Sequence, residues 1–249
     1  GYNAMDLHMT EDQGCRANIW RDQSGAQVLD ANGNDFSWMI GYNLVSWNDP
    51  NGDPKGAPDP NADKFYNRDE LTEIVNYAKS RHIEIIPAVD YPTHADCIIA
   101  KYKSNFVDTG TDFTFRYDGA TYTGHSSLQG GNNATINIGD DYARTLSFAV
   151  TDAYAKFFGD FGCTKFNIGG DEPFDTIFGE HALNDEGETY FAYMQQICDD
   201  VRGRGLTPMM WGDVAHNYPD KIDRLGDVVY LEWHYDKGLF NDECCKVYA

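Results

Sequence analysis

Asp171 and Glu172 are adjacent acids that follow two glycines in the stretch FNIGGDEP. Carboxyl groups can act as general acid, general base, nucleophile or charge stabiliser, depending on how the environment tunes each pKa. Neighbouring side chains in a regular strand point to opposite faces, so both acids can serve one site only where the strand has ended. Gly169 and Gly170 permit a bend at that point. The alternative is a solvated turn, because Gly, Asp and Pro are common turn residues.

The stretch VDYPTHAD contains a second candidate pair, Asp90 and His94. A histidine at this position could hold Glu172 by a hydrogen bond and tune its pKa. Glu11 or Asp12, in the stretch HMTEDQGCR, could contact the other ring nitrogen. The alternative is a turn that contains a structural histidine.

Two tryptophans, Trp211 and Trp233, end two apolar runs, and each has an acid close by, Asp213 and Glu232 respectively. Buried tryptophan is most often part of the core. An indole ring is also a flat apolar wall that suits the apolar face of a sugar ring, with neighbouring acids accepting hydrogen bonds from the hydroxyl groups. The pairs therefore indicate either core packing or a sugar pocket.

A metal site must be weighed against these interpretations. A mixed oxygen and nitrogen ligand set is available from Asp6, His8, Asp90, His94 and Asp171. However, the DLH sequence differs from the HxH pattern of barrel metallohydrolases, and no further histidine ends a matching strand. The six cysteines contain no CxxC pattern, which argues against a zinc site, although Cys15 and Cys97 both fall near strand ends and could be neighbours. We expect neither a metal nor another cofactor.

Composition limits the class of protein. The 249 residues are 41% hydrophobic and 14% aromatic, which is enough for a substantial core. The formal net charge of −21 argues against nucleic acid and anionic membrane surfaces as partners and fits a neutral or cationic ligand. No run approaches the ~20 apolar residues of a membrane span.

Apolar runs typical of buried strands alternate with amphipathic runs typical of helices, the pattern of a parallel α/β fold. The expected strands cover 2–9, 83–90, the run ending at FNIGG, 207–213 and 227–233, and the expected helices cover 68–81, 141–158 and 188–204. No GxGxxG follows the first strand, so a dinucleotide fold is not supported. Polar residues gather at the carboxyl ends of five strands, where a (β/α)8 barrel builds its active site. We therefore expect an α/β TIM-type barrel with insertions near 23–65 and 105–138.

Five motifs resemble, in their order and spacing, those of family 20 glycoside hydrolases, the β-N-acetylhexosaminidases. They are YNAMDLHMTEDQGCR, IEIIPAVDYPTHAD, FNIGGDEP, TPMMWGDV and VVYLEW. GGDE is the most specific of them in this context. SWNDPNGDP and THADCIIA are similar to the bacterial branch that includes surface hexosaminidases and lacto-N-biosidases.

The resemblance implies roles for individual residues. Glu172 corresponds to the general acid/base, and Asp171 to the acid that orients the 2-acetamido group of the substrate, whose carbonyl oxygen is the nucleophile in this substrate-assisted family. His94 and Glu11 correspond to the histidine and the acid of a relay that supports the acid/base. The residues expected to bind the substrate are Trp211, Trp233, Asp213, His8 and Asp90.

The resemblance also implies the function and boundaries of the domain. We expect an exo-acting retaining enzyme that removes terminal β-linked N-acetylhexosamine from glycans, and that is secreted or on the cell surface. A lacto-N-biosidase and an inactive sugar-binding relative are the alternatives. The matched motifs are those of strands two to six, so we expect residues 1–249 to be part of one barrel whose other strands come from outside this chain. Departures from the family pattern occur at Asp6, Ala88, Thr93 and Cys15.

Overall fold

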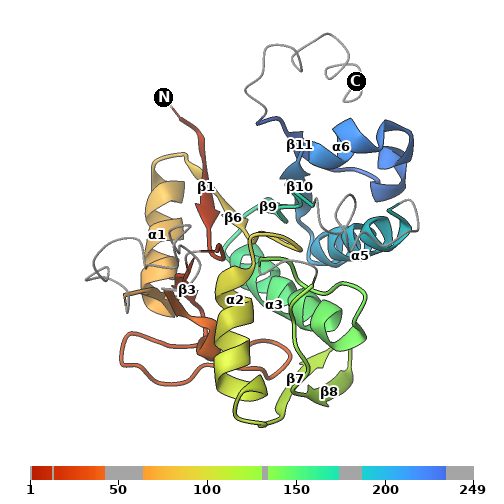
Figure 1. The fold of residues 1–249 in the computed structure, drawn as a ribbon. Coiled ribbons are helices and arrows are strands. Elements are labelled where there is room, and N and C mark those ends of the chain that lie inside the picture. The colour runs from red at the N-terminus through yellow and green to blue at the C-terminus, as the bar shows by residue number, and fades with distance from the viewer. Residues whose placement is uncertain (1, 13, 43–63, 131–133, 174–186, 234–249) are drawn as a thin grey trace, which may run out of the picture.

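The fold is built on a sheet of five parallel strands, seen in a computed structural model (Figure 1). The structure describes residues 2–12, 14–42, 64–130, 134–173 and 187–233. The strands, in their order across the sheet, are β1 (Ala4–His8), β6 (Glu84–Ala88), β9 (Lys165–Asn167), β10 (Thr207–Trp211) and β11 (Val229–Leu231). All five expected strands are therefore present, each within its predicted range or directly before its glycines.

Because the strands are parallel, their carboxyl ends meet at one edge of the sheet. The register pairs His8 with Ala88, Ala88 with Asn167 and Trp211 with Leu231. Among the described residues, β1 and β11 each pair with a strand on one side only, so the five strands form an open sheet. These five strands do not close into a barrel, and the expectation that this chain supplies only strands two to six of one stays a prediction.

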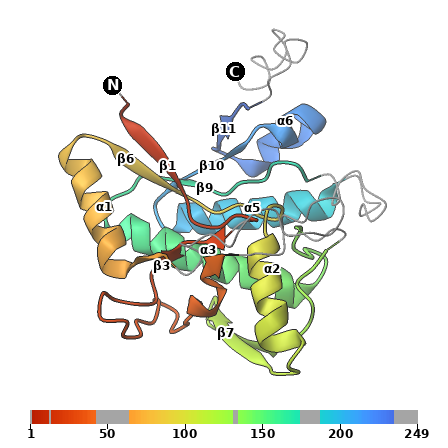
Figure 2. The same ribbon diagram turned by 60° about the vertical axis from the view of Figure 1, so that its left-hand side comes forward.

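Three long helices follow the strands, as the periodicity predicted. They are α1 (Arg68–Ser80), α3 (Asp141–Asp160) and α5 (Glu188–Gly203). α3 and α5 pack side by side beneath the sheet, and α1 lies at its β1–β6 end (Figures 1 and 2). Asn67 begins α1 with a capping box: its side chain accepts hydrogen bonds from the Asp69 and Glu70 amides, while Glu70 accepts one from the Asn67 amide.

The segments between β1 and α1 form two small pairings. β2 (Gly14–Cys15) is antiparallel to β4 (Gly41–Tyr42), and β3 (Ala17–Asn18) is parallel to β5 (Tyr66–Asn67). The short helix η1 (Ser37–Met39) precedes β4. The predicted insertion near 23–65 thus contains short elements and turns in its described part, and 43–63 lies outside the described residues.

The predicted hairpin within 105–138 is present as β7 (Phe113–Tyr117) and β8 (Ala120–Gly124). It is preceded by elements that sequence periodicity did not indicate, α2 (Asp96–Tyr102) and the π-helical turn η2 (Lys103–Val107). The helices α6 (Asp213–Asn217) and η3 (Pro219–Leu225) connect β10 to β11. Within the described residues, no helix combines the length and apolar character needed to cross a membrane.

Candidate active site

The two adjacent acids, Asp171 and Glu172, follow β9 after a backbone bend that favours glycine. Gly169 and Gly170 both have left-handed backbone, with φ of +76° and +86°. A Cβ added at Gly169 would lie 2.1 Å from Asp90 Oδ1, so the chain after β9 passes directly over Asp90, the second residue beyond β6. The bend ends β9 and lets both acids turn toward one histidine.

His94 contacts both acids through one ring nitrogen. Its Nε2 lies 3.4 Å from Asp171 Oδ2 and 3.2 Å from Glu172 Oε2. The side chains become more exposed from Asp171 (17%) through His94 (26%) to Glu172 (42%), so Glu172 is the group that reaches solvent. His94 and Glu172 are also non-glycine residues with left-handed φ, of 48° and 45°. Such strain is frequent where a site demands one geometry.

The other ring nitrogen of His94 contacts Asp12, whereas the resemblance had assigned this position to Glu11. His94 Nδ1 lies 3.0 Å from Asp12 Oδ2, and Asp12 Oδ1 accepts a hydrogen bond of 3.1 Å from the Asp96 amide. Glu11 instead contacts His8, with 2.9 Å between Glu11 Oε1 and His8 Nδ1. Glu11 and Asp12, although adjacent in sequence, therefore contact two different histidines.

The groups around His94 favour its protonated form. The hydrogen bond to Asp12 and then that to Asp171 raise the pKa of His94 to about 12, although burial opposes the charge. An imidazolium ring donates from both nitrogens, which matches acids on both sides. Burial alone would raise the pKa of Asp171, but hydrogen bonds from His94 and Asp90 leave it below its usual value.

Asp90 is buried, with 3% of its surface exposed, and lies against Asp171. Burial, followed by repulsion from Asp171 and hydrogen bonding to it, raises the pKa of Asp90 well above its usual range. When both groups are ionised they can only accept hydrogen bonds, and Asp90 Oδ1 and Asp171 Oδ1 find no donor among the described residues. A proton kept on Asp90 would allow it to donate to Asp171 and hold that side chain in place, while its expected contact with a substrate stays a prediction.

Asp213 is buried as well, and both of its carboxylate oxygens are occupied. Oδ1 accepts a hydrogen bond of 3.1 Å from the Glu172 amide, and Oδ2 accepts one of 2.5 Å from Trp233 Nε1. Asp213 thus connects the backbone of Glu172 to the indole of Trp233. Each Asp213 oxygen thus already accepts one hydrogen bond from the protein, and the expected contact of Asp213 with a substrate stays a prediction.

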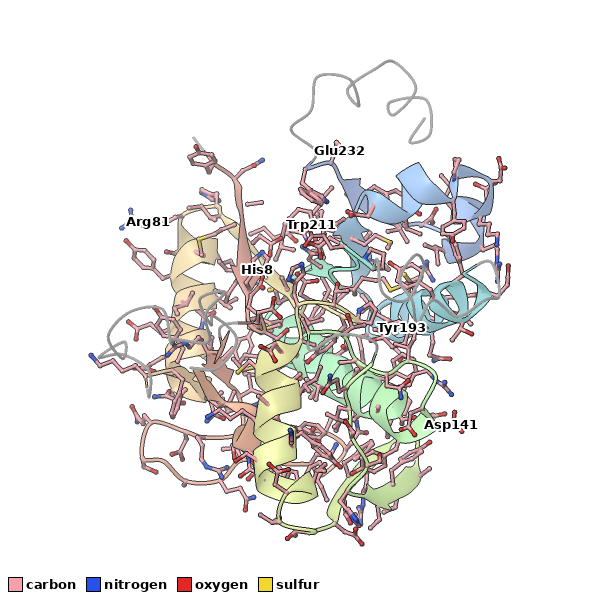
Figure 3. The ribbon with its side chains drawn as sticks, in the orientation of Figure 1. His8, Arg81, Asp141, Tyr193, Trp211 and Glu232 are labelled. Carbon is pink, nitrogen blue, oxygen red and sulfur yellow. The ribbon has the colours of Figure 1, made fainter. Side chains whose placement is uncertain are left out.

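The end of β1 faces the end of β10. The His8 ring stacks near the Trp211 indole, with 6.3 Å between ring centroids and 25° between planes. His8, Trp211 and Glu232 mark the ends of β1, β10 and β11 in Figure 3. Deeper on β1, Asp6 accepts a hydrogen bond of 2.9 Å from the Asn167 side chain. Of the residues expected to bind the substrate, His8 and Trp211 therefore lie side by side, and the His8 side chain is partly exposed.

Within the part of the chain that the structure describes, two groups of side chains could hold a metal ion. Each brings its ligand atoms within 4.8 Å of one another, and they are His8 with Glu11 and Asp90, and Asp90 with His94 and Asp171. In the second group the raised pKa values of His94 and Asp90 mean that a metal ion would have to displace protons before it could bind. The first group shares Asp90 and therefore the same difficulty.

Three residues of the site were missed or left open by sequence reasoning. Asp12 was one of two candidates for His94. Thr93 was noted only as a departure from the family pattern, yet its Oγ1 donates a hydrogen bond of 2.5 Å to the Asp171 carbonyl oxygen. Asn167 accepts a hydrogen bond from the Gly169 amide and so fixes the bend after β9. A buried asparagine at the end of a strand was the signal for this last role.

Comparison with known proteins places this geometry in a family. The catalytic domain of glycosyl hydrolase family 20 matches residues 1–243. The chain is 26% identical over 201 residues to a β-hexosaminidase of Emericella nidulans, covering 72% of this chain and 30% of that protein. It is 28% identical over 149 residues to β-hexosaminidase B of Pseudoalteromonas piscicida, covering 55% and 18%. The chain thus spans less than a third of these relatives' length.

Solved structures share the fold. The tandem family 20 catalytic modules of the pneumococcal exo-β-D-N-acetylglucosaminidase superpose with a TM-score of 0.64 at 21% identity, covering 97% of this chain and 53% of that one. The N-acetyl-β-hexosaminidase of Streptomyces plicatus gives 0.58 at 22% identity, covering 99% and 38%. With the match over residues 1–243, these findings establish that the chain belongs to glycosyl hydrolase family 20, as part of its catalytic domain.

Proposed function

We propose that the protein is a retaining glycoside hydrolase that removes terminal β-linked N-acetylhexosamine from glycans. The observation that carries the proposal is the position of His94 Nε2, 3.4 Å from Asp171 and 3.2 Å from Glu172. One protonated histidine thereby holds two acids side by side while leaving Glu172 open to solvent. Such an arrangement suits two acids that act on neighbouring atoms of one sugar.

The chemistry divides between the two acids. Glu172 donates a proton to the glycosidic oxygen while the carbonyl oxygen of the substrate's acetamido group attacks the anomeric carbon and the glycosidic bond breaks. Asp171, kept ionised by its contact with His94, accepts a hydrogen bond from the acetamide nitrogen and stabilises the positive charge of the oxazolinium ring. Glu172 then takes a proton from water as the water attacks the anomeric carbon and reopens the ring.

The surrounding residues position these groups. Asp12 balances the charge of His94 from the far side, at 3.0 Å. Asp90 holds Asp171, and Asp213 holds both the Glu172 backbone and Trp233. Asp90 and Asp213, expected from the sequence to bind substrate, are thus proposed to be positioning residues.

The sugar ring is proposed to stack on aromatic side chains. Trp211, stacked near His8, and Trp233 offer apolar surfaces to the ring. Stacking of one sugar ring on two indoles would suit a terminal residue, which is the basis for proposing exo action. The pneumococcal structure with the shared fold is of an exo-β-D-N-acetylglucosaminidase, which supports N-acetylglucosamine as a first substrate to test.

We further propose that residues 1–249 supply strands two to six of a (β/α)8 barrel, with the remaining strands contributed from outside this chain. The free sides of β1 and β11 support this arrangement, because a parallel sheet is normally covered and closed. Secretion or display on the cell surface belongs to the same proposal and has its basis in the family.

The test is hydrolysis of an aryl N-acetyl-β-glucosaminide compared with an aryl lacto-N-bioside by the full-length protein. The proposal predicts release of the aryl group from the monosaccharide substrate. Release from the disaccharide substrate alone would identify a lacto-N-biosidase. Turnover of neither, with retained sugar binding, would identify an inactive sugar-binding relative.

A further inference from the structure

Two cysteines on separate segments meet beneath the site. Cys15, on β2, is paired in register with Gly41 on β4, and Cys97 Sγ lies 3.5 Å from the Gly41 carbonyl oxygen. α2, which carries Cys97, packs against β2. The two thiols are in hydrogen-bonding contact with each other, and the Cys15 backbone amide also points at Cys97 Sγ. Both residues are completely buried.

This thiol pair connects the two segments that form the acid–histidine contact. Asp12 lies three residues before Cys15, and His94 lies three residues before Cys97. Asp12 also accepts a hydrogen bond from the Asp96 amide, directly before Cys97. The polar contact and the thiol contact therefore hold the same two segments together, one at the site and one in the core behind it.

We propose that Cys15 and Cys97 form a disulfide bond that cross-links the segment carrying Asp12 to α2, the helix that follows His94. The two cysteines are free thiols in the structure and already neighbours, so the partners of the bond are in place before oxidation. It closes the long loop that contains α1 and β6, which restricts the unfolded chain. It also ties Asp12 to His94 covalently through the residues that follow each of them.

The oxidant is a small-molecule disulfide, which exchanges with the pair by ordinary thiol chemistry. The Cys97 thiolate attacks the oxidant, forms a mixed disulfide and releases one thiolate. Cys15 loses its proton, attacks the Cys97 sulfur and releases the second. Two cysteine thiols are oxidised, one disulfide is reduced to two thiols, and the two protons move to the released thiolates. Since both cysteines are buried in the folded protein, exchange takes place late in folding, when the two thiols already meet but are still open to solvent.

The contact itself selects Cys97 as the attacking group. The hydrogen bond from the Cys15 thiol, followed by that from the Cys15 amide and the charge of Lys101, lowers the pKa of Cys97 although burial opposes this. The same contact and burial raise the pKa of Cys15. A thiolate is the nucleophile in thiol–disulfide exchange, so the order of steps follows.

The test is disulfide mapping of the protein refolded in a buffer of reduced and oxidised glutathione. The protein is alkylated with N-ethylmaleimide in denaturant, digested and analysed by mass spectrometry. We expect one linked peptide pair that contains Cys15 and Cys97, resolved into two labelled peptides only after reduction. Cys163 and Cys198, buried thiols elsewhere in the fold, should be labelled without reduction. Labelled Cys15 and Cys97, or either cysteine paired with another one, would overturn the proposal.

Thermal unfolding gives a second readout that does not depend on enzymatic activity. Reduction should lower the unfolding temperature of the oxidised protein by about 5–10 °C. Cys15→Ala and Cys97→Ala should each remove this response to reductant, whereas the matched control Cys163→Ala should retain it. If reductant leaves the unfolding temperature of the unsubstituted protein unchanged, the result contradicts a stabilising cross-link.

Discussion

His94 Nδ1 lies 3.0 Å from Asp12 Oδ2, which makes Asp12 the residue that balances the charge of the site histidine. A carboxylate behind the ring favours the imidazolium form and fixes its orientation. The same ring presents its other nitrogen to both acids that follow β9. The behaviour of the site therefore depends on an acid that does not touch the proposed position of the sugar.

We predict that Asp12→Asn lowers the pKa of His94 from about 12, because the amide oxygen still accepts from Nδ1 but carries no charge. NMR titration of the imidazole signals measures this change. Glu11→Gln, the matched control one residue away, should leave His94 unchanged and lower the pKa of His8, which is raised chiefly by its hydrogen bond to Glu11. A larger shift of His94 in the Glu11 variant would reverse the assignment.

Gly169→Ala should destabilise the fold by about 3 kcal/mol or more, because the new methyl group would overlap the Asp90 side chain and backbone at a left-handed position. Denaturant unfolding measures the loss. Gly25→Ala is the matched control, since Gly25 has φ of +80° but no atom within 4 Å of the added Cβ. It should cost only about 1–2 kcal/mol from the backbone. Equal losses would mean that the close approach to Asp90 contributes nothing.

The unfolding free energy of Asp90→Asn minus that of the unsubstituted protein should increase as pH rises from 4 to 7. The folded pKa of Asp90 is raised, so its contribution is fully present below the unfolded value of about 3.9 and is lost as pH rises toward the folded pKa. The slope is about 1.4 kcal/mol per pH unit within that window. Unfolding curves at both pH values provide the comparison. Asp141→Asn, at a side chain that is 89% exposed, should show no such trend; a flat response in the Asp90 variant would argue that Asp90 ionises freely.

Activity should survive exhaustive chelation, because the proposed chemistry uses only the carboxyl groups of Asp171 and Glu172 and the acetamido group of the substrate. The measurement is turnover of the aryl substrate before and after dialysis against a chelator. Loss of turnover that Zn²⁺ or Mn²⁺ restores would instead support metal-assisted hydrolysis.

The framework of the site could be predicted because it depends on patterns that local sequence encodes. Short buried runs alternate with amphipathic runs, so β1, β6, β9, β10 and β11 were recognisable, and parallel strands bring their carboxyl ends to one edge. α2 was not recognisable, since seven residues without a side-chain cap show little periodicity.

The partners within the site depended on the path of the chain rather than on residue type. The backbone turn in which the Gly14 amide donates to the Glu11 carbonyl oxygen sends Glu11 toward His8 and Asp12 toward His94. Two neighbouring acids look equivalent in sequence, and only this turn separates them. Asp213 was likewise recognised as an acid near a tryptophan, but its burial follows from its place as the first residue of α6.

The most direct test of the account is the turnover of Glu172→Gln beside that of Glu11→Gln, a matched acid-to-amide change outside the proposed chemistry. The account predicts that kcat for an aryl N-acetyl-β-glucosaminide falls by about two to four orders of magnitude in the Glu172 variant, the usual contribution of a general acid/base. The affinity for an unreactive N-acetylglucosamine analogue should persist, and the Glu11 variant should lose far less activity. A near-normal kcat in Glu172→Gln would contradict the account, since no other residue in it supplies the proton.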